Sequence, residues 1–215
     1  MEAVTWPWYL KRKKMSNPYK ISNFVRIRDQ RIFHGEKKLF SCEEATHLKR
    51  FLKESYKFLN ISYPKFHKMD ALCKLGILAA EVLFKNMEIP TDTALVFSNS
   101  ASSLETDKKH KILMEATVSP AVFVYTLPNI VLGEISIKHK LQSENAFFIS
   151  DKFNAGLLAD YSEILLDTSK ADAVVCGWIE WKNAEYDVFL CLISKEGEVS
   201  FSEENLEELY RFENE

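Results

Sequence analysis

The fold is decided by a stretch that reads SPAVFVYTLPNIVLGEISI (119–137), NAFFISDKFNAGLLADY (145–161) and ADAVVCGWIEW (171–181). Its first piece is an apolar segment interrupted by prolines, and 145–150 is a short apolar run. Helical periodicity follows over 154–168, and then a strand-like run. A strand, a sharp junction and a helix is where α/β enzymes often carry a nucleophile. The junction here, 150–156, contains neither a Cys nor a G-x-S-x-G motif.

Outside this stretch the sequence predicts strands and helices in turn. The clearest helix is 68–85, and Ser41 with Glu44 fits the capping box of another helix that ends near Leu59. The expected strands are 20–33 (a strand or a hairpin), 94–97, 146–149, 173–179 and 187–194. Helices that separate strands favour a layered α/β sheet, and the last strand follows its neighbour without a helix. We therefore expect a mixed five-stranded sheet with an antiparallel last strand and helices on its faces.

The composition divides the chain into three parts. Residues 1–18 form an arm in which an aromatic cluster precedes four basic residues. Residues 19–195 fit one α/β domain, and 196–215 form an acidic C-terminal helix with eight Glu. Lysines and arginine are concentrated in 49–74, so one end of the molecule could attract an acidic partner.

Several classes of function are excluded by composition. The chain has 215 residues, a net charge of −3 and 47% hydrophobic residues, which indicates a folded core and no general attraction for nucleic acid. It contains no Gly-rich phosphate loop. No apolar run approaches about 18 residues, so no membrane span is expected. The four cysteines lack zinc-ligand and disulfide-framework spacing, which predicts no metal, no cofactor and a reducing, cytoplasmic setting.

An ordered series of motifs resembles the β-ketoacyl-acyl carrier protein synthases. HKMD (67–70) before an Ala/Leu-rich helix resembles their R-M-D segment. Ser119–Ile135 resembles the helix before their active site, and 145–156 followed by Ala171–Gly177 resembles their strand, nucleophile junction, helix and A-D-x-x-x-x-G strand. The order holds over about 20–195. The chain is most similar to the ketosynthase-like N-terminal domains of aryl-polyene and flexirubin clusters, including chain-length-factor-like subunits.

The resemblance implies a thiolase-like fold, in which a complete member has two similar halves. This sequence matches the first half and stops after its last strand, so we expect a thiolase-like half-fold. The family's nucleophile is a Cys at a helix N-terminus, where the helix dipole lowers its pKa. The alignment puts Phe153 at or beside that position, and phenylalanine cannot attack a thioester. The histidines of this chain lie outside the matching motifs.

Three functions stay open. The first is a catalytically inactive ketosynthase-like subunit, chain-length-factor-like or a scaffold, in fatty-acid, polyketide or aryl-polyene biosynthesis, which pairs with itself or with an active ketosynthase. The second is an acyltransferase or β-ketoacyl synthase that acts on acyl-carrier-protein or coenzyme A thioesters at a non-standard site, with Ser150, Asp151 and Cys176 as candidates. The third is a carrier-protein-binding module. We prefer the first, because the nucleophile, the second half and Gly-rich catalytic loops are missing together.

Two surfaces follow from the same resemblance. In the family, the strand before the nucleophile pairs across the dimer axis, and this maps the dimer strand onto Ala146, Phe147, Phe148, Ile149 and Ser150. An acidic carrier protein would meet basic side chains, and the docking candidates are Lys49, Arg50, Lys53, Lys65 and Lys68.

Overall fold

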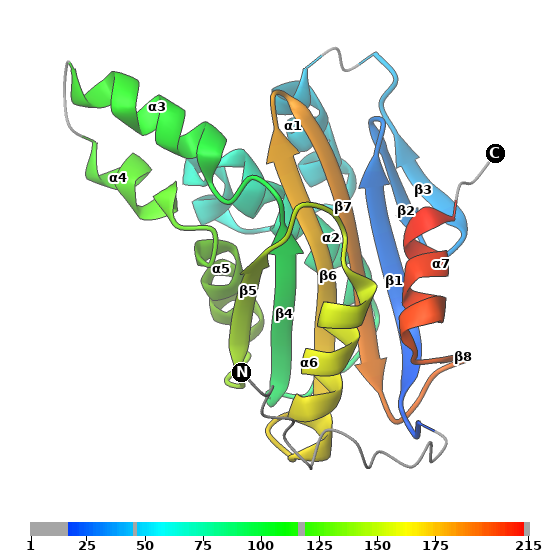
Figure 1. Ribbon diagram of the computed structural model, residues 1–215. Coiled ribbons are helices and arrows are strands. Elements are labelled where there is room, and N and C mark those ends of the chain that lie inside the picture. The colour runs from blue at the N-terminus through cyan, green and yellow to red at the C-terminus, as the bar shows by residue number, and fades with distance from the viewer. Residues whose placement is uncertain (1–16, 45–46, 116–118, 213–215) are drawn as a thin grey trace, which may run out of the picture.

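The computed structural model describes residues 17–44, 47–115 and 119–212, so most of the predicted N-terminal arm lies outside the described residues. A single mixed sheet lies at its centre, with helices on both faces (Figure 1). The strands are β1 (Lys20–Arg28), β2 (Arg31–His34), β3 (Lys37–Ser41), β4 (Thr93–Asn99), β5 (Asn145–Ile149), β6 (Ala173–Lys182), β7 (Glu185–Ser194) and β8 (Val199–Ser200). The α-helices are α1 (Leu48–Phe58), α2 (Ala71–Leu83), α3 (Leu104–Met114), α4 (Pro120–Phe123), α5 (Ile130–His139), α6 (Ala155–Asp167) and α7 (Glu203–Arg211). Two 3-10 helices are η1 (Pro64–Lys68) and η2 (Val124–Thr126).

The strand order of the sheet is β3-β2-β1-β7-β6-β4-β5, and β8 pairs with β1. β4 is parallel to both β5 and β6, whereas β6 and β7 are antiparallel, with Cys176 opposite Cys191. The expected mixed sheet, with its antiparallel pair of 173–179 and 187–194, is therefore confirmed. The expected number of five strands is wrong, because the described sheet has eight.

Most of the extra strands come from the N-terminal part of the domain. Asp29 and Gln30 have φ values of 47° and 57°, which suit the tight turn that joins β1 to β2. Gly35, at φ 60°, then turns the chain into β3. The expected helix start at Ser41 is also wrong, since Ser41 ends β3 opposite Arg31, and α1 begins at Leu48. Strand pairing at this point prevails over the local capping signal.

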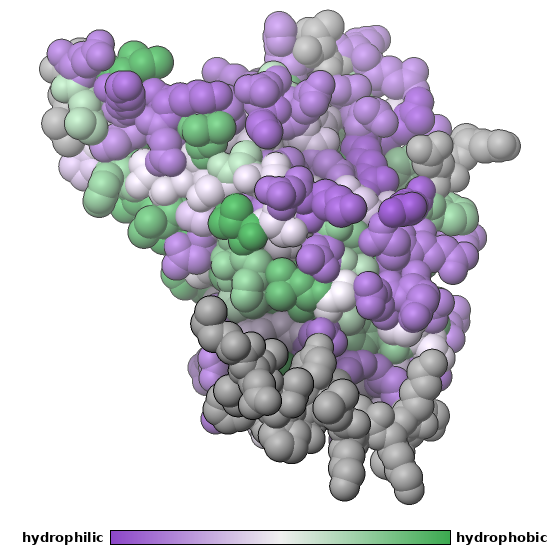
Figure 2. All heavy atoms as spheres, in the orientation of Figure 1, coloured by the Kyte–Doolittle hydropathy of each residue, from purple (hydrophilic) through white to green (hydrophobic). Residues whose placement is uncertain are grey.

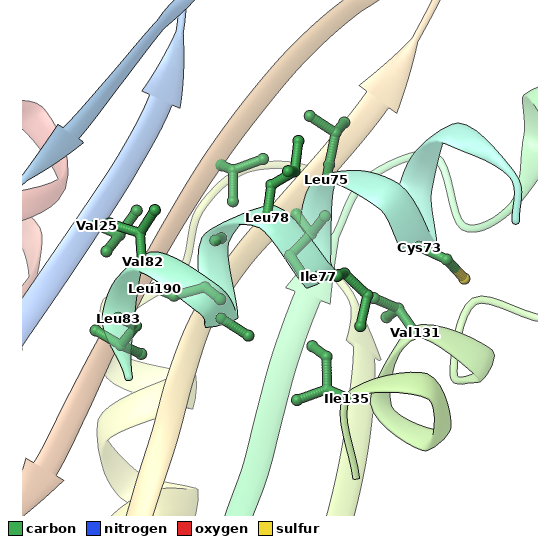
Figure 3. Close-up of a cluster of buried hydrophobic side chains, with 14 of the residues drawn as sticks. Val25, Cys73, Leu75, Ile77, Leu78, Val82, Leu83, Val131, Ile135 and Leu190 are labelled. Carbon is green, nitrogen blue, oxygen red and sulfur yellow. The ribbon is translucent and has the colours of Figure 1, made fainter. Parts of the chain in front are cut away.

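One face of the sheet is covered by α1, α2 and α5, which we call the α2 face. The expected helix over 68–85 is α2, whose N-terminus is capped by the Asp70 carboxylate as it accepts a hydrogen bond from the Cys73 N–H (2.9 Å). Gly76 allows α5 to approach closely, because a Cβ at this position would lie 2.3 Å from Val131 Cγ2. Figure 3 shows Val131 and Ile135 of α5 beside α2. The larger of the two hydrophobic cores lies here.

The opposite face carries α6 and α7, and we call it the α6 face (Figure 1). The expected helix over 154–168 is α6, with Asn154 Oδ1 accepting a hydrogen bond from the Leu157 N–H (2.9 Å). α7 is also capped by a side chain, since Ser202 Oγ accepts a hydrogen bond from the Asn205 N–H (3.2 Å). β4 is buried along its whole length and contributes to the cores on both faces.

β5 forms one edge of the sheet, and α3 and α4 project beyond that edge (Figure 1). Figure 2 shows hydrophobic side chains gathered around α4, α5, β5 and α6, with hydrophilic surface over α3 and α7. We call this region, together with the apolar C-terminal end of α3, the apolar overhang, and we define it by the exposed residues Ile112, Met114, Phe123, Val124, Leu127, Ile137 and Ile149. Exposed apolar side chains in such a cluster indicate an interaction surface.

Candidate functional site

The junction between β5 and α6 has the strand–turn–helix geometry expected from the sequence. β5 ends at Ile149, and α6 begins at Ala155. Phe153 lies just before the N-cap residue Asn154 and is only 6% exposed. The N-terminus of a helix of this length would stabilise a negative charge placed there. The side chain that the fold puts beside it is instead an uncharged aromatic ring.

Three aromatic rings pack around Phe153. Tyr210 of α7 stacks on it, with 3.9 Å between ring centroids and 17° between ring planes. Phe189 of β7 and Trp178 of β6 meet it edge-on, at 5.7 Å and 6.4 Å. This aromatic cluster fills the space next to the helix N-terminus. The sequence reasoning did not include Tyr210, because its contact with Phe153 joins segments far apart in the chain.

α7 is held in place by polar contacts as well as by the aromatic cluster. The Tyr210 hydroxyl donates a hydrogen bond to Asp187 Oδ2 (2.6 Å), while Arg28 Nε pairs with the other oxygen of the same carboxylate. The Arg28 guanidinium also lies over the Tyr210 ring, 4.5 Å from its centroid. Burial, together with the Asp187 carboxylate, raises the pKa of Tyr210, so this hydroxyl stays protonated as a donor.

The three candidate nucleophiles of the sequence analysis lie in different settings. Ser150 is half-buried, and its N–H donates to the Asn99 carbonyl (2.9 Å), whereas Asp151 is exposed. Cys176 is fully buried in the sheet, with its Sγ 3.5 Å from Cys191 Sγ. Within the part of the chain that the structure describes, no hydrogen bond joins any of the three to a histidine.

Polar groups at the carboxyl ends of β4 and β6 form hydrogen bonds within the protein. The Ser100 N–H and hydroxyl both donate to Glu180 Oε2, at 2.7 Å and 2.5 Å. Asn99 closes the same turn through hydrogen bonds with the Ser102 N–H and carbonyl, at 2.8 Å and 2.9 Å. These groups bind the loop after β4 to β6, and their hydrogen-bonding capacity is used within the protein.

The five predicted docking residues differ in whether their charges are already paired. Lys65 pairs with the buried Glu134 carboxylate (2.8 Å), and Arg50 pairs with Glu44 (3.1 Å). Lys49 and Lys53 lie on α1, and no carboxylate of the described residues lies within 4.0 Å of either ammonium group. Lys68 is exposed at the end of η1. Only part of the predicted set therefore has a charge that is not already paired.

Glu134 is a buried carboxylate that the sequence reasoning missed. It is 3% exposed, pairs with Lys65 and accepts a hydrogen bond from the Tyr125 hydroxyl (3.2 Å). Burial and the Glu134 charge raise the pKa of Tyr125. A single acidic residue inside the apolar run 130–137 is the sequence signal that could have identified it. The contact joins α5 to η1 and η2.

The predicted dimer strand is the edge strand β5. Its partner β4 occupies one side only, so along the sheet the other side of β5 has no neighbouring strand among the described residues. Ile149 is 56% exposed, while Phe148 packs edge-on against Tyr161 of α6 (5.2 Å). An unpaired edge of this kind presents N–H and C=O groups to a second strand.

The described residues contain no group of three or more His, Cys, Asp and Glu side chains that could hold a metal ion. The same residues include no single helix that is long and apolar enough to cross a membrane. One bent pair, Pro120–Thr126 with Ile130–His139, meets that test by length and composition alone.

Comparison of the sequence with known protein families and with curated proteins gave no match. Comparison of the structure gave matches among condensing-enzyme structures. The ishigamide ketosynthase/chain length factor matches at a TM-score of 0.63 and 15% identity, over 82% of this chain and 62% of that one. The ketosynthase ApeO in complex with its chain length factor ApeC, from Xenorhabdus doucetiae, matches at 0.57 and 14%, over 88% of this chain and 82% of that one.

A third match is the AntDE:AntF complex, a type II polyketide synthase acyl-carrier protein with its ketosynthase bound to the hexaketide. It has a TM-score of 0.53 and 12% identity, over 81% of this chain and 61% of that one. The chain thus spans about three fifths of the first and third matches. These likenesses show that the chain has a ketosynthase-like fold, which the motif series predicted.

Proposed function

We propose that this chain is a non-catalytic ketosynthase-like subunit, of the chain-length-factor type or a scaffold, in a pathway that builds polyketide or aryl-polyene chains. The observation that carries the proposal is Phe153. The motif resemblance maps Phe153 at or beside the nucleophilic Cys of that family, and in this chain the ring is buried under Tyr210. A side chain without a lone pair cannot accept an acyl group from a thioester.

The partner surface of such a subunit would be β5 together with the apolar overhang. Edge pairing of β5 supplies backbone hydrogen bonds, and the overhang supplies apolar area. The exposed Ile149, Leu127 and Phe123 side chains would then become buried. The ApeO–ApeC match supports this proposal, because that structure is a ketosynthase complexed with a chain length factor. We propose an active ketosynthase as the partner, with a second copy of this chain as the alternative.

The first experiment tests the lack of catalysis. The purified chain is incubated with an acyl-carrier-protein thioester and with an acyl-coenzyme A, and its intact mass is measured beside that of an active ketosynthase. We expect the ketosynthase to gain an acyl group and this chain to keep its mass. A stable adduct that maps to Ser150, Asp151 or Cys176 would contradict the proposal and favour an enzyme with a non-standard nucleophile.

The second experiment tests the pairing surface. Light scattering after size exclusion measures the mass of the chain alone and of the chain co-expressed with a ketosynthase. We expect a stable pair that is lost in Ile149→Asp and Leu127→Asp, and retained in Phe58→Asp, whose side chain is similarly exposed but lies on α1. A chain that stays monomeric at 24.9 kDa in both preparations would contradict the proposed role.

Carrier-protein docking is a second candidate function. Lys49 and Lys53 have no carboxylate partner among the described residues, and the AntDE:AntF match contains an acyl-carrier protein bound to its ketosynthase. An acidic carrier protein would be attracted to such charges. Lys49→Glu with Lys53→Glu should weaken carrier binding at least about tenfold, since two attractive contacts become repulsive. Lys170→Glu is the control, because Lys170 is an exposed lysine outside this surface.

A further inference from the structure

A groove of about 590 Å³ opens between α1, η1, α2 and the hairpin that joins β6 to β7. Its volume lies within the range of small-molecule sites, about 300–1,000 Å³. It belongs to the α2 face, since the buried Leu52 and Phe66 on its wall are part of that core. The Phe153 cluster belongs to the α6 face. The groove is therefore separate from the β5–α6 junction.

The positive charges of the groove come from different helices. Lys49 and Lys53 extend from α1, and Lys74 extends from α2. Lys74 is half-buried, and its ammonium lies 5.9 Å from the centroid of the Phe66 ring. The acidic lining residue, Glu105, is already paired with Lys108 (2.7 Å).

Lys74 also shows that these charges act on one another. Burial lowers the pKa of Lys74, the nearby Asp70 opposes this, and the charges of Lys109 and Lys49 lower it further. An ammonium that is partly removed from water and repelled by other lysines gains free energy from an anion placed next to it. The groove thus has a polar end that favours a negative group.

The remainder of the wall is mainly apolar and aromatic, and its other polar members are Gln30, His47 and His67. Trp181 and Tyr186 come from β6 and β7, and Leu52 and Phe66 complete the surface. The Tyr186 hydroxyl accepts a hydrogen bond from the Gln30 N–H (3.0 Å), so the ring is fixed in place. Such a surface would cover a hydrocarbon chain or an aryl ring, while the lysines meet a charged end.

We propose that the groove binds an apolar monocarboxylate, an alkyl or aryl group that ends in one carboxylate, with Lys49 and Lys74 holding the carboxylate and Phe66 and Trp181 covering the apolar part. A singly charged group suits the site, because a half-buried position penalises a dianion more strongly than a monoanion. Ligand binding in the groove would be a property additional to the proposed pairing role, and it does not depend on that role.

Titration calorimetry with three small probes tests the assignment on the full chain. Octanoate has the tail and the charge, octanol has the tail alone, and acetate has the charge alone. We expect octanoate to bind at least about tenfold more tightly than either of the others, since a charge-assisted contact and apolar burial act together. Octanol binding as tightly as octanoate, or no octanoate binding at millimolar concentration, would overturn the proposal.

Two variants in the groove and one control variant test whether octanoate binds there. Lys49→Met and Lys74→Met should each reduce octanoate affinity about tenfold, and Lys170→Met, outside the groove, should leave it unchanged. Amide NMR spectra of each variant verify the fold and report whether octanoate shifts Trp181 and its neighbours. Equal losses in all three variants, or shifts confined to other parts of the protein, would show binding elsewhere and overturn the assignment.

Discussion

The two faces of the sheet use their aromatic and charged side chains in opposite ways. On the α6 face, Phe153 lies beside the N-terminus of α6 and stacks on Tyr210. Asp187 is paired with Arg28 and accepts a hydrogen bond from the Tyr210 hydroxyl. On the α2 face, aromatic residues line an open groove beside Lys49 and Lys74. The strand–turn–helix junction on the α6 face is closed by packing, whereas the groove on the α2 face has lysines available to a ligand.

This difference shows that a familiar backbone geometry and side chains that are free to bind or react are separate properties of a site. A strand–turn–helix junction places a side chain at a helix dipole whether or not that side chain is reactive. Phe153, which lies at such a junction, is part of a hydrophobic core. A binding site needs polar groups whose partners are not already inside the protein, and this condition holds at the groove rather than at the junction.

The largest expected effect is a loss of stability when the aromatic cluster on the α6 face loses the Phe153 ring. Phe153→Ala should lower the free energy of unfolding by about 3–4 kcal/mol, because it removes a buried ring and leaves a cavity beneath Tyr210. Urea unfolding followed by circular dichroism measures it. Phe58→Ala, at a ring that is 49% exposed, should cost less than half as much. Similar losses in both would mean that the aromatic cluster is not a packed core.

A second prediction compares two helical glycines on the α2 face. Gly76→Ala should destabilise the protein by about 2 kcal/mol, since its Cβ would lie 2.3 Å from Val131 Cγ2 and α5 would have to move. Gly133→Ala has no atom within 4 Å of the added Cβ and should be neutral or stabilising by up to about 1 kcal/mol. Thermal unfolding of both variants distinguishes close packing from helix propensity. A change of stability with the same sign in both variants would contradict the close packing of α5 against Gly76.

A smaller effect is expected for the attachment of α7. Tyr210→Phe keeps the stacked ring and removes the hydroxyl that donates to Asp187, so it should cost about 1 kcal/mol. Hydrogen exchange of the α7 amides should increase in this variant, while the α2 amides stay protected. Unchanged exchange in α7 would show that the ring contact alone holds the helix.

The smallest effect concerns pH and the contact between α2 and α5. Burial opposes ionisation of Glu81, but hydrogen bonds and charges from His139 and Lys138 prevail and lower its pKa below 4.5. The stability that Glu81 contributes is therefore present above pH 4.5 and is lost as pH falls through the lowered value. The loss should be below about 1 kcal/mol, since the carboxylate is partly exposed.

Urea unfolding of the native chain and of Glu81→Gln at pH 7 and at pH 3.5 measures this contribution. The stability difference between the two proteins should shrink at the lower pH. A difference that grows on acidification would contradict the lowered pKa of Glu81.

The strand and helix assignments could be made from sequence wherever the signal was local. The stripe of 154–168, the apolar run that became α2 and the cap at Ser202 depend on residues a few positions apart. The helix start expected at Ser41 was wrong because the capping pattern depends on Ser41 and Glu44 alone, whereas Ser41 pairs with Arg31 across the β2–β3 hairpin. The candidate site divides in the same way: the junction could be located from sequence, but the rings around Phe153 could not.

By itself the sequence determined an α/β order of elements, an antiparallel final pair, a junction without Cys and a basic segment around α1 and α2. The tertiary structure alone decided that β1 lies beside β7, that Tyr210 closes over Phe153, and that Lys65 is paired with Glu134 while Lys49 and Lys74 line a groove. The physical reason is the distance along the chain over which each interaction acts. Periodicity and caps act between near neighbours in the chain, whereas burial and charge pairing depend on which distant segments meet.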